Sequence, residues 1–249
     1  MTTQATRSAS ATAPQASQSG DGYPRRGAAR IAGVSYLAMF ALAVFANFVV
    51  REGLIDVDDM AATVANISES IGLFRLGLVA FVAVFVLDVV IAGALHVVFR
   101  DVNHDMSLAT AWFRLIYAAL LGVALVSMFQ VQQILGRDSL EFLTTEQISA
   151  QTMIELASFE SAWLIGLVGF GIHLAMLGVL IVRSGLVART LGYLLIAAGL
   201  VYVLDTLAQG MLPDYEAVAG FFLVAVALLS MIGEGWLALW LLLTKELEN

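Results

Sequence analysis

Six stretches of apolar residues recur along the chain, separated by short polar connections. They occupy residues 31–50, 71–99, 108–135, 161–182, 190–211 and 217–243. A bilayer core of roughly 30 Å requires about 20 predominantly apolar residues for one helical crossing. The alternating pattern of membrane-spanning strands is absent from the sequence. The pattern therefore predicts an all-α integral membrane protein with six transmembrane helices.

Two connections carry a helical pattern of their own. Asp58 and Asp59 can cap free N–H groups at the start of a helix, and apolar residues then repeat at helical spacing into the second stretch. Thr144 and Gln147 fit a capping box ahead of a similar apolar face. Both segments are predicted to be short amphipathic helices that lie on the membrane surface or cover the bundle.

Composition agrees with a membrane protein and excludes several kinds of chemistry. Hydrophobic residues make up 60% of the 249 residues, charged residues only 13%, and the mean hydropathy is +0.90. A soluble domain would carry about a quarter charged residues. Cysteine is absent, which excludes disulfides, thiolate nucleophiles and cysteine metal ligands.

The first thirty residues differ from the rest of the chain. Residues 1–30 are rich in Ser, Thr, Ala, Gln and Gly, which predicts a disordered tail. A cleaved signal peptide is the alternative interpretation, but its apolar region would span about 7–15 residues. The stretch over residues 31–50 is longer and contains only Asn47 as a polar residue. We therefore expect it to remain as the first transmembrane span.

Basic residues are distributed unevenly between the two sides of the predicted bundle. The N-terminal tail, the second and fourth connections and the C-terminal tail hold eight of them: Arg7, Arg25, Arg26, Arg30, Arg100, Arg183, Arg189 and Lys245. The other three connections hold Arg51 and Arg137. By the positive-inside rule, both termini are predicted to be cytoplasmic.

The opposite face is predicted to be strongly negative. Its three connections carry twelve acidic residues: Glu52, Asp56, Asp58, Asp59, Glu69, Asp138, Glu141, Glu146, Glu155, Glu160, Asp214 and Glu216. The few, scattered basic residues give no support for nucleic-acid binding. The predicted partners are membrane lipids and a small-molecule or proton ligand.

Several polar side chains interrupt the apolar stretches. The candidates for a buried polar or ligand site are Arg75, Asp88, Arg114, His173, Tyr202, Asp205 and Glu234. A charged side chain at the centre of the bilayer costs about 2.5–3.5 kcal/mol on insertion scales. These side chains must therefore be paired, neutralised or hydrated inside the bundle.

Depth along each stretch predicts which charged groups meet. Arg75 and Asp205 lie at similar depth near the non-cytoplasmic face, which predicts an outer pair. By the same counting, Arg114 and Glu234 are predicted to share an inner layer. Asp88 lies near mid-depth, like His173, so these two could form an acid/base or proton-relay pair. Each pair could equally be a structural clamp that fixes the register of two helices.

Metal and cofactor sites have little support. His96 and His173 differ in depth by roughly 9 Å, which disfavours their binding the same haem iron as its two axial ligands. The paired-histidine spacing of zinc proteases is absent, as are nucleotide-binding glycine loops and nucleophile elbows. No metal or cofactor is predicted, and the sequence leaves the catalytic residues unassigned.

A set of short segments in a fixed order carries a resemblance to a known family. The segments are Gly72-Leu-Phe-Arg75-Leu-Gly77, Leu87-Asp88-Val, Phe113-Arg114-Leu, Gly171-Ile-His173, Leu191-Gly192-Tyr193-Leu, Tyr202-Val-Leu-Asp205 and Gly233-Glu234. In these segments the chain resembles a bacterial family of multi-pass membrane proteins catalogued as domain of unknown function 4386. The likeness runs from about Arg30 to Leu243. It implies the fold and draws attention to the same charged positions, but it implies no activity.

Three functions remain open at this point. The first is small-molecule or proton-linked transport or binding, with the charged groups lining a polar cavity. The second is a structural or sensory membrane protein in which the charge pairs are packing clamps. The third is a membrane-embedded enzyme that acts on a lipid or quinone, with Asp88 and His173 as the acid/base pair.

Overall fold

All regular structure in the described part of the chain is helical. The computed structural model describes residues 24–136, 143–245 and 247. In chain order the elements are α1 (Arg25–Val44), the π-helix η1 (Phe45–Arg51), α2 (Glu52–Leu54), α3 (Met60–Glu69), α4 (Ile71–Phe99), α5 (His104–Leu135), α6 (Thr145–Ser184), α7 (Arg189–Met211) and α8 (Glu216–Leu243). Six helical segments are long and apolar enough to cross a membrane, the first formed by α1, η1 and α2 together. The predicted six-span, all-α multi-pass membrane fold is confirmed.

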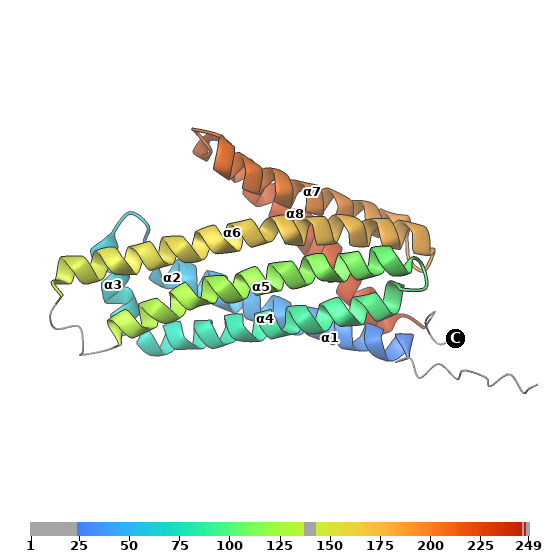
Figure 1. The fold of residues 1–249 in the computed structure, drawn as a ribbon, viewed down its shortest axis with the longest axis horizontal. Coiled ribbons are helices and arrows are strands. Elements are labelled where there is room, and N and C mark those ends of the chain that lie inside the picture. Colours follow the sequence, from blue (N-terminus) through green and yellow to red (C-terminus); the bar gives the residue numbers. More distant parts are fainter. Residues whose placement is uncertain (1–23, 137–142, 246, 248–249) are drawn as a thin grey trace, which may run out of the picture.

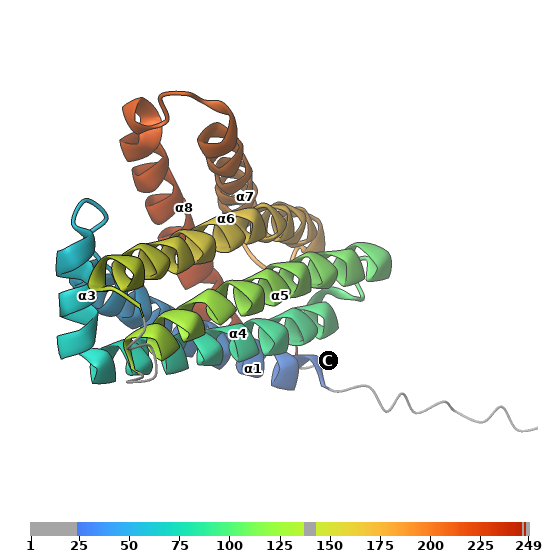
Figure 2. The same cartoon turned by 60° about the vertical axis from the view of Figure 1, so that its left-hand side comes forward.

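The six spans form a closed ring. α1 packs against α4 and α8, and the ring continues from α4 through α5, α6 and α7 back to α8. The start of α1 and the C-terminus lie at the same end of the bundle, here called the terminal end (Figure 1). At the opposite, far end, the turn joining α7 to α8 diverges from the other helices (Figure 2). Apolar side chains such as Val79 and Phe221 are exposed on the outside of the ring, where acyl chains would contact them.

The helices extend beyond the apolar stretches at the terminal end. α1 begins at Arg25, so residues 25–30 of the predicted tail are helical, while residues 1–23 lie outside the described part of the chain. Arg25 explains this extension, because its Nη2 donates to the Val98 carbonyl at 2.9 Å and its Nη1 pairs with Asp101 at 3.4 Å. α5 likewise begins at His104, capped by the Asn103 side chain.

The two predicted amphipathic helices begin where expected but end differently. Asp59 caps α3 by accepting a hydrogen bond from the Ala62 N–H, and a short break at Ser70 separates α3 from α4. Thr144 and Gln147 form the predicted capping box. The helix that follows is continuous with the fourth span, which makes α6 a single helix of 40 residues. At 1.5 Å per residue it is about 60 Å long, so it projects well beyond the hydrocarbon core.

Glycine pairs bring α6 and α7 into backbone contact. A Cβ added to Gly171 would lie 2.6 Å from the Gly199 carbonyl oxygen, and one added to Gly192 would lie 2.6 Å from the Gly178 carbonyl oxygen. Any larger residue at these positions would collide with the facing helix. The two pairs lie two turns apart and hold α7 tightly against one side of α6.

The cytoplasmic placement of both termini stays a prediction that a fusion experiment can test. We expect green fluorescent protein fused after residue 249 to fluoresce, because it folds in the cytoplasm. Alkaline phosphatase fused at the same position should be inactive, because it needs export to form its disulfides. An active phosphatase fusion together with a dark fluorescent fusion would reverse the orientation.

Candidate functional site

An ion pair lies at the centre of the helix ring. Arg114 on α5 and Asp88 on α4 place Nη2 and Oδ1 2.7 Å apart, and both side chains are completely enclosed by protein. Leaving either charge alone at this depth would cost several kcal/mol, so the pair stabilises both ionised groups. The energetic cost of an unpaired charge thus explains why these two side chains point inward from neighbouring helices.

Arg114 is also the hub of contacts from the first span. Its Nη1 donates to the Tyr36 hydroxyl at 2.8 Å, and its Nη2 donates to the Met39 sulfur at 3.4 Å. The guanidinium carbon lies 4.9 Å from the centre of the Tyr36 ring and 5.4 Å from that of Phe170. Cation–π attraction in a desolvated site adds to the ion pair. The arginine therefore ties α1, α4, α5 and α6 together.

His173 on α6 completes the cluster as a neutral side chain. Its Nε2 lies 3.0 Å from Arg114 Nη1, and its Nδ1 lies 2.9 Å from the Thr110 carbonyl oxygen. Arginine can only donate and a carbonyl can only accept, so Nε2 accepts and Nδ1 carries the proton. Both ring nitrogens are thus already bonded. His173 orients Arg114 instead of forming the predicted relay pair with Asp88.

The predicted middle and inner layers are in fact one layer. Measured from the terminal end of each helix, Tyr36 lies eleven residues from Arg25 and Asp88 eleven from Phe99. Arg114 lies ten residues from His104, His173 eleven from Ser184 and Glu234 nine from Leu243. Because α5 begins at His104, four residues before the apolar stretch, Arg114 lies deeper than its sequence position indicated. Its ion-pair partner is consequently Asp88, and not Glu234 as predicted.

Glu234 reaches the same layer from α8 without a dedicated partner. Within the described part of the chain, its Oε2 is buried and makes no hydrogen bond. The carboxyl group lies within electrostatic range of Arg114 and Asp88. A Cβ added to the neighbouring Gly235 would find no atom within 4 Å, so the backbone beside the carboxyl group borders open space.

Four polar atoms of this layer are buried without a hydrogen-bond partner among the described residues: Asp88 Oδ1 and Oδ2, Arg114 Nε and Glu234 Oε2. Of these, Asp88 Oδ1 is held by the ion pair with Arg114, which leaves the other three unpaired. Most buried polar atoms in proteins find a partner, since an unsatisfied one costs about 1–3 kcal/mol. The layer therefore combines a fixed ion pair with spare acceptors and a spare donor.

Comparison with known proteins agrees with this arrangement. The family described as "Domain of unknown function (DUF4386)" matches residues 31–244, which includes every residue of the cluster. The chain belongs to the DUF4386 family. It is also 27% identical, over 160 residues, to an uncharacterized protein of Archaeoglobus fulgidus; the match covers 64% of this chain and 78% of the relative. No solved structure matches the chain.

Tyr202 lies beside the central layer of this DUF4386 protein. Its ring makes an edge contact with Phe170, with ring centres 5.4 Å apart. Phe170 in turn contacts Tyr117 and His173. Tyr202 also lies within electrostatic range of Glu234. The aromatic side chains thus connect α7 to the charged cluster without taking part in its ion pair.

Arg75 and Asp205 are not brought together. Arg75 is exposed and its Nη2 lies near Gly136 at the C-terminal end of α5, where a positive charge favours the helix dipole. Asp205 accepts a hydrogen bond of 2.6 Å from the Tyr215 hydroxyl in the α7–α8 turn. Partial burial and this hydrogen bond raise the pKa of Tyr215 to about 12. The predicted outer pair is absent from the described residues because α4 and α7 are not neighbours in the ring.

The sequence did not identify a second polar cluster around Arg51. The Arg51 guanidinium carbon lies 5.0 Å from the Phe159 ring centre and 5.2 Å from that of Trp163, and Nη2 pairs with Glu160 Oε1. Arg51 Nη1 also donates to Asn47 Oδ1 at 2.9 Å. The π-helical turn η1 positions Arg51 for these contacts, and such turns are frequent at functional sites. Only the polar Asn47 inside the first span hinted at this cluster.

The described residues include no set of side chains that could ligate a metal ion. No three His, Asp or Glu side chains among them gather closely enough to hold an ion. His96 faces Ser107 and the ring of His104 at the terminal end, away from His173.

Proposed function

We propose that this DUF4386 protein lies in the cell (plasma) membrane and binds a small molecule or proton there, as part of proton-linked transport or binding. The observation that carries this proposal is the buried, unpartnered carboxyl oxygen of Glu234 beside an ion pair that is already complete. An intramembrane ionisable residue is by default a candidate for a functional site, and the free oxygen of Glu234 leaves it able to bind a ligand.

The charges of the central layer support binding of a proton or a cation. Arg114 is neutralised by Asp88 at 2.7 Å, and His173 is neutral. An ionised Glu234 therefore adds a net negative charge to a low-dielectric layer. Binding a proton or a cationic group would remove that charge at this position, which gives the site an energetic reason to bind one.

Proton flux into reconstituted vesicles tests this proposal. Purified protein is placed in liposomes with a trapped pH-sensitive dye, and a potassium gradient with valinomycin drives protons inward. We expect flux above that of protein-free vesicles, and we expect Glu234→Gln to reduce it to the protein-free level, because the amide cannot take up a proton.

A matched variant separates the specific effect from general damage. Glu216→Gln changes an exposed glutamate in the first turn of the same helix and should leave the flux unchanged. Wild-type flux in Glu234→Gln would disprove a proton-carrying role for this carboxyl group, and so would equal loss in both variants.

The structural or sensory alternative also has a specific observation in its favour. Asp88, Arg114 and His173 are enclosed and tied to four helices, as expected for a clamp that fixes helix register. If such a clamp were the whole role of the layer, Glu234→Gln would change the stability of the protein but would leave the proton flux unchanged. The enzyme alternative has no comparable support, because both ring nitrogens of His173 are already bonded.

A further inference from the structure

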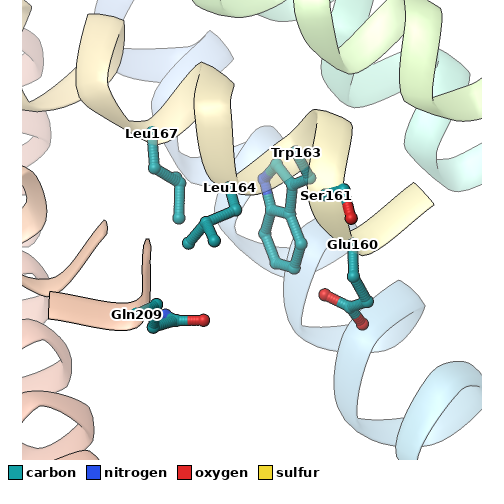
Figure 3. A pocket seen from close by; sticks show the side chains of 6 residues that line it. All are labelled: Glu160, Ser161, Trp163, Leu164, Leu167 and Gln209. Atoms are coloured by element: carbon teal, nitrogen blue, oxygen red, sulfur yellow. The ribbon is translucent and has the colours of Figure 1, made fainter. Parts of the chain in front are cut away.

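A pocket of about 310 Å³ opens between α6 and α7, separate from the central charged layer (Figure 3). Its lining residues are Glu160, Ser161, Trp163, Leu164, Leu167 and Gln209. The volume falls within the range of about 300–1,000 Å³ that is typical of small-molecule sites. His173 lies thirteen residues further along α6 than Glu160, about 20 Å away along the helix axis. The pocket is therefore a distinct site near the far end of the ring.

The walls of the pocket combine apolar, aromatic and negatively charged surface. In Figure 3 the indole ring of Trp163 lies between the side chains of Leu164 and Glu160. Gln209 faces these three side chains from α7. The Glu160 side chain is 52% exposed. A ligand here would meet the Trp163 side chain, an apolar wall and a carboxylate within one small volume.

Arg51 pairs with this carboxylate but is not itself among the residues that line the pocket. It contacts Glu160 Oε1 while its guanidinium lies against Phe159 and Trp163, and its side chain is only 17% exposed. The contact uses one of the two carboxylate oxygens, and the other keeps its acceptor capacity. Glu160 lines the pocket and Arg51 does not, so the pocket presents the negative end of this ion pair to an approaching molecule, while the positive end is the more deeply buried one.

The surroundings of the pocket favour the same sign of ligand. Gln209 lies two residues before the end of α7, so the pocket borders the connections that carry most of the acidic residues of the chain. A surface with an excess of negative charge raises the local concentration of cations.

We infer that this pocket binds a small organic cation of the quaternary or tertiary ammonium class. The aromatic ring and the carboxylate would attract the positive nitrogen, and the leucines would contact its alkyl substituents. This inference goes beyond the proposed role of Glu234 and does not depend on it.

Calorimetric titration of the protein in lipid nanodiscs tests this inference, with choline as the cationic probe. The control probe is the neutral analogue of choline in which carbon replaces the nitrogen. We expect choline to bind and the neutral analogue to bind about tenfold more weakly or not at all, since only the cation gains from the carboxylate and the ring.

Variants of this chain locate the binding site. Glu160→Gln should weaken choline binding about tenfold, and Leu164→Trp should abolish it by filling the pocket while keeping the Arg51–Glu160 contact. Glu146→Gln, an exposed glutamate in the first turn of the same helix, should change nothing. Glu234→Gln should also retain binding, so the two sites can fail independently.

Three outcomes would overturn the assignment. They are equal binding of the cation and its neutral analogue, wild-type affinity in Leu164→Trp, and no detectable binding of choline to the wild-type protein.

Discussion

Replacing Arg114 with methionine is expected to destabilise the protein by about 3–5 kcal/mol, because it leaves Asp88 charged and alone in the centre of the ring. Asp88→Leu should cost a similar amount by leaving Arg114 uncompensated. The free energy of unfolding can be measured by titrating the protein from mild detergent into SDS and following helix content or tryptophan fluorescence.

The double variant distinguishes an ion pair from two independent residues. Asp88→Leu with Arg114→Met removes both charges and substitutes apolar side chains, so its cost should be well below the sum of the single costs. Arg183→Met serves as the control, since this exposed arginine lies in the last turn of α6 and should change stability by less than about 0.5 kcal/mol. Additive costs in the double variant would contradict the ion pair.

The fold of this DUF4386 protein was predictable because each span crosses one uniform apolar medium. Runs of apolar residues mark the spans directly, and the six predicted runs correspond to the six observed segments. Helix ends were less predictable, since polar residues outside the hydrocarbon core can remain helical. Arg25 extends α1 through contacts with Val98 and Asp101, which only the folded chain brings together.

The residues of the central site could be predicted from the sequence, because burying a charged side chain in a membrane is costly. That cost selected Asp88, Arg114, His173 and Glu234, and the structure brings all four to one layer. The pairing was not predictable, because depth was counted from the edges of apolar runs, and these edges differ from the helix ends.

Several contacts of the polar side chains were also missed. Tyr36 is an aromatic residue in an apolar stretch and has the same appearance in sequence as a lipid-facing side chain. Arg51 was assigned to a connection, because the π-helical turn that points it at Trp163 has no sequence signature in this chain. Arg75 and Asp205 were paired from depth alone, and sequence does not specify which helices are neighbours in the ring.

The glycines between α6 and α7 give the second large effect. Gly192→Leu is expected to destabilise the protein by about 3 kcal/mol, at the upper end of overpacking costs. Its Cβ would lie 2.6 Å from the Gly178 carbonyl oxygen and 2.6 Å from Val182 Cγ2, so the backbones themselves must separate. The same SDS titration measures the loss.

Gly210→Leu provides the comparison within the same helix. An added Cβ there meets nothing within 4 Å, so the substitution should be neutral or slightly stabilising, because leucine favours helix over glycine by up to about 1 kcal/mol. A difference between the two variants therefore measures the packing of α6 against α7 and not glycine flexibility. Since the same helix contact holds Tyr202 against Phe170, Gly192→Leu should also loosen the aromatic contacts beside the charged layer. Equal stability of Gly192→Leu and Gly210→Leu would mean that the two backbones are not in contact.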